Sequence, residues 1–137
     1  MAVGKKKKKP RQQELWVETT ALPQVAGHPF FTKLNAFLEK HNFDAFVENL
    51  CAPFYAGNVG RPGLAPGVYF RMLLIGYFEG IGSDRGIAWR VEDSLALRDF
   101  LGFALTEHTP DHSTLSAARH RIDLETHQEV LRFALSA

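Results

Sequence analysis

Two histidines in one short segment have the spacing of metal ligands. His108 and His112 lie four residues apart within Glu107-His108-Thr109-Pro110-Asp111-His112, and on a helix that spacing would put two imidazoles on one face. Pro110 lies between them and would remove a helix-interior hydrogen bond, so a helix is not expected there. No third ligand occurs at motif spacing. The segment is therefore expected to be a loop whose Asp111 or Ser113 caps the next helix, with no metal or cofactor bound.

Nucleophilic and phosphate-binding chemistry is not indicated either. Cys51 lies in an apolar stretch between Leu50 and Pro53, where a buried, inert thiol is the ordinary outcome. The chain contains no GxSxG, P-loop or GxGxxG pattern, and its Gly-rich segment 57–67 lacks the Lys-Ser/Thr pair that engages phosphates. We therefore expect no catalytic residue and no enzymatic activity in this chain.

Polar and basic side chains instead gather on one predicted helix. Over residues 113–122, with Ser113 as a possible cap, the apolar side chains Leu115, Ala118 and Ile122 recur at helical spacing. The opposite face would carry hydroxyl, imidazole and guanidinium groups that can donate to phosphates or base edges. The residues that we expect to contact DNA in this helix are Ser113, Thr114, Ser116, His120 and Arg121.

Three further arginines have two possible roles. Arg85 and Arg90 form a second basic spot, and Arg119 lies nearer the inward edge of its helix. Each could contact the DNA backbone or support the fold, Arg119 as an ion-pair partner and Arg85 by stacking on Trp89 four residues later. The sequence leaves both roles open.

A basic arm precedes the body of the chain. Lys5, Lys6, Lys7, Lys8, Lys9 and Arg11 carry six positive charges, whereas residues 12–137 hold 10 basic and 15 acidic groups. Such a run stays solvated and is suited to binding phosphates, although a disordered terminus without a specific partner is the alternative. Any nucleic-acid surface on the acidic body must then be a local patch.

The elements that position these residues are all predicted to be helices. With 137 residues, 45% of them hydrophobic, the chain has the size and composition of one globular domain. We divide it into an irregular, basic lead-in (1–27) and a compact multi-helix domain with a helix-turn-helix-like arrangement (28–137). Two short helices broken near His41-Asn42 come first, the second ended by Pro53. A helix over 68–78, apolar on nearly every side, is expected in the centre of the core.

Short capped helices complete this all-α prediction. They span 83–91, 95–101 and 113–122, and a last helix begins at Asp123 and runs to the end without a stop signal. That ending is expected of a chain truncated before a further domain. One cysteine, no signal peptide and no apolar run of membrane-spanning length predict a cytoplasmic protein.

Four linked motifs carry a family resemblance. The runs GRP at 60–62, APGVYFRMLL at 65–74, GIGSDR at 80–85 and PDHSTLS at 110–116 resemble the N-terminal domain of bacterial insertion-sequence transposases of the DDE class (InsH-like), and LWV at 15–17 is similar too. The resemblance covers residues 28–137. It implies a helical domain that recognises the terminal inverted repeats of the element and precedes an RNase H-like catalytic domain, which is absent here. Ala117 stands where the family pattern has basic character, which shifts more of the phosphate binding to the lysine arm.

The sequence-level hypothesis is thus a DNA-binding part of a nucleoid-associated bacterial transposase whose partner is double-stranded DNA. The alternative is an interaction module that forms a homodimer or docks on, and inhibits, full-length transposase. Such a surface could use the aromatic residues of the first half, Phe30, Phe31, Phe37, Phe43 and Phe46. An inert remnant with an uncovered apolar face is the third possibility.

Overall fold

The computed structural model describes Gly4, residues 28–55 and residues 63–135. Within these residues the regular structure consists of seven helices and contains no strand, which confirms the all-α prediction. They are α1 (Pro29–Lys40), α2 (Phe43–Tyr55), α3 (Pro66–Glu79), α4 (Asp84–Glu92), α5 (Leu95–Leu101), α6 (His112–Arg121) and α7 (Leu124–Leu135). None of the described helices is long and apolar enough to cross a membrane.

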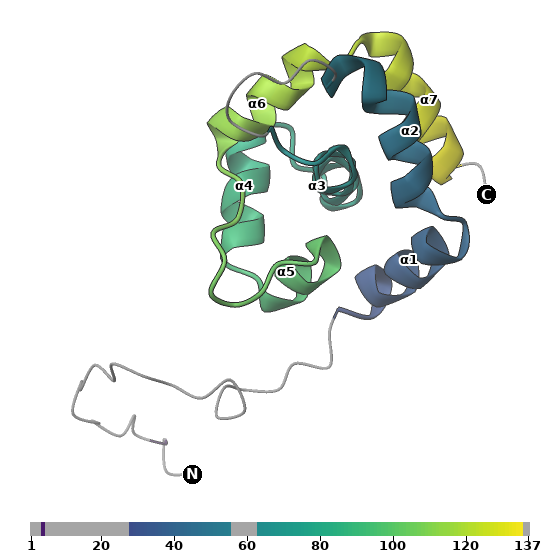
Figure 1. Ribbon diagram of the computed structural model, residues 1–137. Helices are drawn as coiled ribbons and strands as arrows, with labels where there is room; N and C mark the ends of the chain where they lie inside the picture. The colour runs from purple at the N-terminus through teal and green to yellow at the C-terminus, as the bar shows by residue number, and fades with distance from the viewer. Residues whose placement is uncertain (1–3, 5–27, 56–62, 136–137) are drawn as a thin grey trace.

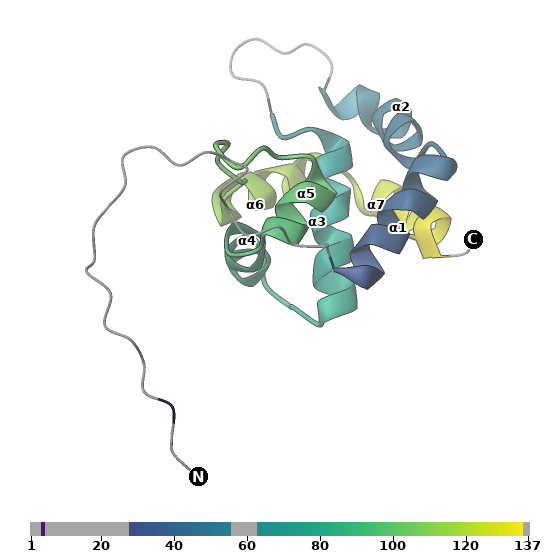
Figure 2. The same ribbon diagram turned by 90° about the horizontal axis from the view of Figure 1, so that it is seen from below.

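Helix α3 is the centre of the domain. Figure 1 looks down its axis, with the other helices arranged around it, and Figure 2 shows it from the side. It packs against α2, α4, α5 and α6, and its side chains are buried on most sides. A helix that is apolar all round is stable only where neighbours cover every face, so the predicted central core helix is confirmed.

One polar residue of α3 is nevertheless buried in this core. Arg71 is 5% exposed and donates to both carboxylate oxygens of Asp44 in α2, each at 3.1 Å. It also donates to Asn35 Oδ1 in α1 at 2.7 Å and to the Phe100 carbonyl in α5 at 3.1 Å. A buried guanidinium needs acceptors for its N–H groups, and Arg71 thereby joins four helices.

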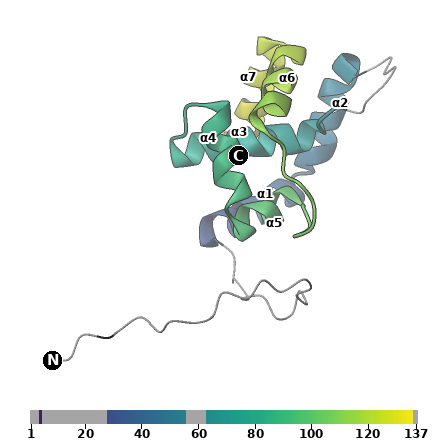
Figure 3. The ribbon, with the colours of Figure 1, turned by 90° about the vertical axis from the view of Figure 1, so that its left-hand side faces the viewer.

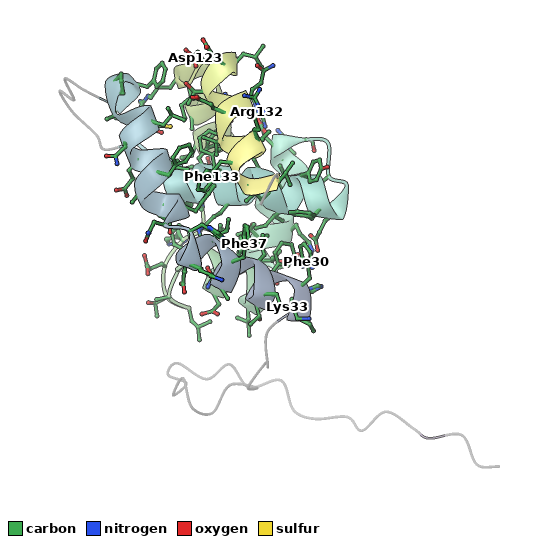
Figure 4. All side chains as sticks on the ribbon, turned by 90° about the vertical axis from the view of Figure 1, so that its right-hand side faces the viewer. Phe30, Lys33, Phe37, Asp123, Arg132 and Phe133 are labelled. Carbon is green, nitrogen blue, oxygen red and sulfur yellow. The ribbon has the colours of Figure 1, made fainter. Side chains whose placement is uncertain are left out.

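Aromatic stacking fixes α7 against α2. The rings of Phe46 and Phe133 lie 4.2 Å apart and nearly parallel, and Figure 4 shows Phe133 on the side of α7 that faces α2. Tyr69 in α3 adds a polar link, because its hydroxyl lies 2.7 Å from Nε2 of His127 in α7. The Nδ1 of that ring lies 2.8 Å from the Asp123 carbonyl, which can only accept. Nδ1 therefore carries the ring proton, and Tyr69 donates to Nε2.

The helices α4 and α5 lie within one residue of their predicted bounds. Ser83 caps α4 and Ser94 caps α5, each accepting a backbone N–H three residues later at 3.1 and 3.2 Å. Gly80 and Gly102 follow α3 and α5 with φ of 71° and 83°, the left-handed conformation that glycine adopts without steric cost. The turn between α4 and α5 is short, and α6 packs across α4 (Figure 3).

One predicted boundary is wrong. Pro53 does not end α2, which continues to Tyr55. It lies in the last turn of the helix, so its missing N–H removes one backbone hydrogen bond near the end of α2 and interrupts no later turn. Of the two candidate caps of α6, Asp111 is the N-cap, and Ser113 lies within the first turn. The prediction of a flexible arm falls on residues outside the described ones, and the boundary at residues 27 and 28 stays a prediction.

Candidate nucleic-acid interface

The predicted recognition surface lies on helix α6. Its buried side chains Leu115 and Ala118, with Ile122 just beyond the helix, hold it against the core. The positions between them are then directed outward by helical periodicity. Ser113, Thr114, Ala117, His120 and Arg121 are exposed, and Ser116 is partly exposed. The structure thus brings all five predicted contact residues of α6 to accessible positions on one helix.

The cap of α6 occupies part of this surface. Asp111 Oδ1 accepts the backbone N–H of Thr114 at 2.8 Å and its hydroxyl at 2.9 Å. These two hydrogen bonds, the backbone one first, hold the pKa of Asp111 below its ordinary value. The hydroxyl proton of Thr114 is therefore committed to the cap, and Ser113 keeps the freer hydroxyl of the pair.

Arg121 is oriented by residues that lie far from it in the sequence. Its guanidinium lies 4.9 Å from the centre of the Tyr55 ring at the end of α2. A Cβ added to Gly63 would come within 2.3 Å of Arg121 Nη1, so only glycine allows this approach. Among the described residues, no carboxylate lies within ion-pair distance of Arg121. Its N–H groups thus have a fixed direction and no counterion in the described part of the chain.

A hollow lies on the surface beside α6. Its volume is about 610 Å³, and it lies between α6 and the segment that leads into α3. The residues that line it are Gly63, Leu64, Asp111, Ser113, Thr114, Ala117, Ala118 and Arg121. Gly63 has no side chain and Ala117 only a methyl group, which leaves the hollow open, and Arg121 and Ser113 supply hydrogen-bond donors. Such a surface can hold an extended polar ligand.

Two of the predicted arginines are held by carboxylates and act as supports. Arg119 in α6 pairs with Asp84 in α4, its Nε lying 3.3 Å from Oδ2, and this hydrogen bonding raises the pKa of Arg119. Arg90 in α4 donates to both oxygens of Glu79 in α3 at 2.9 and 3.0 Å. Each pair joins two helices, so these side chains hold α4 against its neighbours and have fewer N–H groups left for DNA.

Arg85 contacts a histidine at the start of α6, a neighbour that the sequence analysis did not consider beside Trp89. Its Nη2 lies 3.3 Å from Nε2 of His112 at the start of α6, and both residues are exposed. Among the described residues, no three His, Cys, Asp or Glu side chains lie together in a group that could hold a metal ion. The lysines at 5–9 and Arg11 lie outside the described residues.

Tyr55 and Gly63 are the site residues that sequence reasoning missed. Neither belongs to the helix that they serve, and both lie at the edges of the segment that joins α2 to α3. Burial raises the pKa of the Tyr55 hydroxyl, while the positive charge of Arg121 acts in the opposite direction. No periodicity or spacing pattern relates Tyr55 to α6, so only the fold could reveal this contact.

Comparison with known families gives one match. The family described as "Transposase domain (DUF772)" matches residues 20–121. The chain belongs to this transposase-domain family. No curated protein and no solved structure matches it. The matched region ends at Arg121, the last residue of α6, so the family domain includes α1 to α6 and the hollow beside α6. A role related to transposition follows from this membership.

Proposed function

We propose that this transposase-family domain binds double-stranded DNA through the outer face of α6 and recognises the terminal inverted repeats of its element. The observation that carries the proposal is Arg121, stacked on Tyr55 and unopposed by any carboxylate of the described residues. An arginine fork held in one orientation suits bidentate pairing with guanine O6 and N7 or with a phosphate.

The other polar groups of α6 extend this contact. Ser113 and His120 are exposed on the same helix as Arg121, and Ser116 lies partly exposed between them. Hydroxyl and imidazole groups donate to base edges or phosphates. Lys5–Lys9 and Arg11 supply sequence-independent affinity by counterion release. In this proposal the domain is the N-terminal, DNA-reading part of a DDE-class insertion-sequence transposase and has no catalytic activity of its own.

Fluorescence anisotropy with the terminal repeat and with scrambled duplex, each at two salt concentrations, tests the proposal. The Arg121→Ala variant should lose about 1–3 kcal/mol of binding free energy on the repeat and less on the scrambled duplex. Lys33→Ala is the matched control, because it removes one exposed positive charge from α1, on the other side of α3 (Figures 1 and 4). Equal losses for Arg121→Ala on both duplexes would contradict a base-reading role.

The lysine arm is tested separately. Replacing Lys5–Lys9 together by alanine should weaken both duplexes alike and flatten the salt dependence, since fewer counterions are released. The preference for the repeat should remain. Loss of the preference in this variant would move the recognition from α6 to the arm.

The second candidate function is that of a protein-interaction module. Fewer of the aromatic residues named in the sequence analysis are exposed to a partner than the sequence suggests. Phe31 and Phe43 are buried in the core, and Phe37 and Phe46 pack against it. Phe30 is 41% exposed and, with Tyr77 and Phe78 of α3, forms an exposed aromatic cluster with ring separations of 4.8 and 5.2 Å. Sedimentation without DNA tests this function: self-association that Phe30→Ser abolishes would support it.

A further inference from the structure

A second hollow lies beside the N-terminus of α6, next to an exposed tryptophan. Trp89 in α4 is 62% exposed, which is unusual for so large an apolar side chain. It lines a hollow of about 380 Å³ between α4 and the segment that joins α5 to α6. Figure 3 faces this side of the molecule. The side chain thus offers an accessible aromatic surface at the edge of a hollow.

The walls of this hollow are polar and of both signs. His108, Thr109 and His112 can donate or accept hydrogen bonds, and the carboxylate of Glu92 accepts them. Arg85 Nη2 contacts His112 Nε2 at 3.3 Å and adds further donors beside the hollow. The hollow therefore combines an aromatic platform with donors and acceptors in one place.

The hollow is also held in shape. Arg98, one of its lining residues, donates to the Glu92 carbonyl at 3.2 Å and to the Glu107 carbonyl at 3.1 Å. These bonds tie the segment after α5 to the end of α4. A platform whose walls are fixed before binding loses little conformational freedom when a ligand enters.

The chemistry fits a nucleobase better than a phosphate group. A base is planar and stacks on an aromatic ring, and its edge presents both donors and acceptors. The carboxylates of Glu92 and Asp111 would repel a phosphate but can accept a hydrogen bond from an exocyclic amino group. The volume lies within the range of small-molecule sites. Because the faces of bases in an intact duplex are covered by their neighbours, the ligand must be an unstacked base.

We propose that the Trp89 hollow receives an unpaired or extruded DNA base next to the duplex that α6 binds. This inference rests on the proposed function, since it requires DNA beside α6. Asp111 lines both the Trp89 hollow and the hollow that contains Arg121. A duplex on α6 would accordingly bring a frayed end or a bulged base within reach of Trp89.

Tryptophan fluorescence gives a direct test. The chain has two tryptophans, so Trp16→Phe leaves Trp89 as the sole indole. This variant is titrated with a duplex carrying one unpaired thymine, with the same duplex carrying an abasic nucleotide at that position, and with the fully paired duplex. Stacking should quench Trp89 only with the unpaired thymine and favour that duplex by about 5- to 150-fold over the abasic one. Equal affinities and equal quenching would overturn the proposal.

A second variant separates this inference from the proposed function. Trp89→Leu on the natural background should abolish the preference for the unpaired thymine, measured by anisotropy, and leave binding to the fully paired duplex unchanged. If the preference survives, Trp89 is not the platform and the inference fails. If no duplex binds at all, the proposed function fails, and a single-stranded thymine oligonucleotide is then titrated against Trp16→Phe. Quenching there supports the base site, whereas its absence overturns it.

Discussion

Arg71 and Arg121 lie over aromatic rings at the same distance but differ in burial and in hydrogen-bond partners. Each guanidinium carbon is 4.9 Å from a ring centre, that of Phe100 for Arg71 and that of Tyr55 for Arg121. Arg71 is buried, and its N–H groups are taken up by Asp44, a side-chain amide and a backbone carbonyl. Arg121 is exposed and faces no carboxylate of the described residues. Stacking on a ring therefore does not reveal which arginine serves the fold.

The difference lies in the hydrogen-bond partners and in solvent access. A buried guanidinium must find acceptors inside the protein, because an unpaired buried charge is costly. An exposed one can keep its N–H groups for an incoming ligand while a ring fixes its direction. The region around Arg71 is thus committed to holding four helices together, and the region around Arg121 keeps its donors available.

The largest effect is expected at Arg71. Arg71→Met should lower the free energy of unfolding by about 3 kcal/mol, because the buried Phe100 carbonyl and the partly buried Asn35 side chain lose their donor. Arg121→Ala should change it by no more than about 0.5 kcal/mol. Urea denaturation of both variants measures the contrast, and comparable losses would show that Arg121 is also a structural residue.

High pH tests two ionisable groups of the core, Tyr69 and Cys51. Burial raises the pKa of Tyr69 from 10.0 to about 12, so between pH 10 and 12 the unfolded chain releases this proton and the folded chain keeps it. The free energy of unfolding should therefore fall over that interval. Tyr69→Phe should make the fall shallower. The pKa of Cys51 is raised from 9.0 to about 11, so Cys51→Ala should flatten the curve between pH 9 and 11.

A smaller effect is expected from the ring under Arg121. Tyr55→Leu should weaken binding to the terminal repeat by about 1 kcal/mol, because the guanidinium loses the ring that orients it. Tyr55→Phe should bind normally, since it keeps the ring. A double-mutant cycle with Arg121→Ala measures the coupling. Additive losses would mean that Tyr55 does not act through Arg121.

The smallest effect is expected at Gly63. In Gly63→Ala the new Cβ would displace the flexible end of Arg121, so affinity for the repeat should fall a few-fold while the melting temperature stays nearly constant. Gly82→Ala is the control, because a Cβ there meets nothing within 4 Å. A marked loss of stability in Gly63→Ala would show that the backbone, and not only Arg121, has to move.

Some elements of this fold could be predicted because their signals are local. Ser83 and Ser94 cap helices through bonds to residues three positions away, and Gly80 and Gly102 end helices through their own backbone conformation. The error at Pro53 and the choice between Asp111 and Ser113 as the cap of α6 also concern single turns. The tendency of proline to end a helix was outweighed by the turn around Pro53. At α6, Asp111 took the cap position for which Ser113 was the other candidate.

The sequence by itself determined the helices, the central place of α3 and the outward direction of Ser113, His120 and Arg121 on α6, because periodicity and capping act within about one turn. Only the tertiary structure decided which arginines form ion pairs that stabilise the fold. Arg71 meets Asp44 across 27 positions and Arg119 meets Asp84 across 35. Such partners are chosen by how the helices pack around α3, and no local pattern encodes that packing.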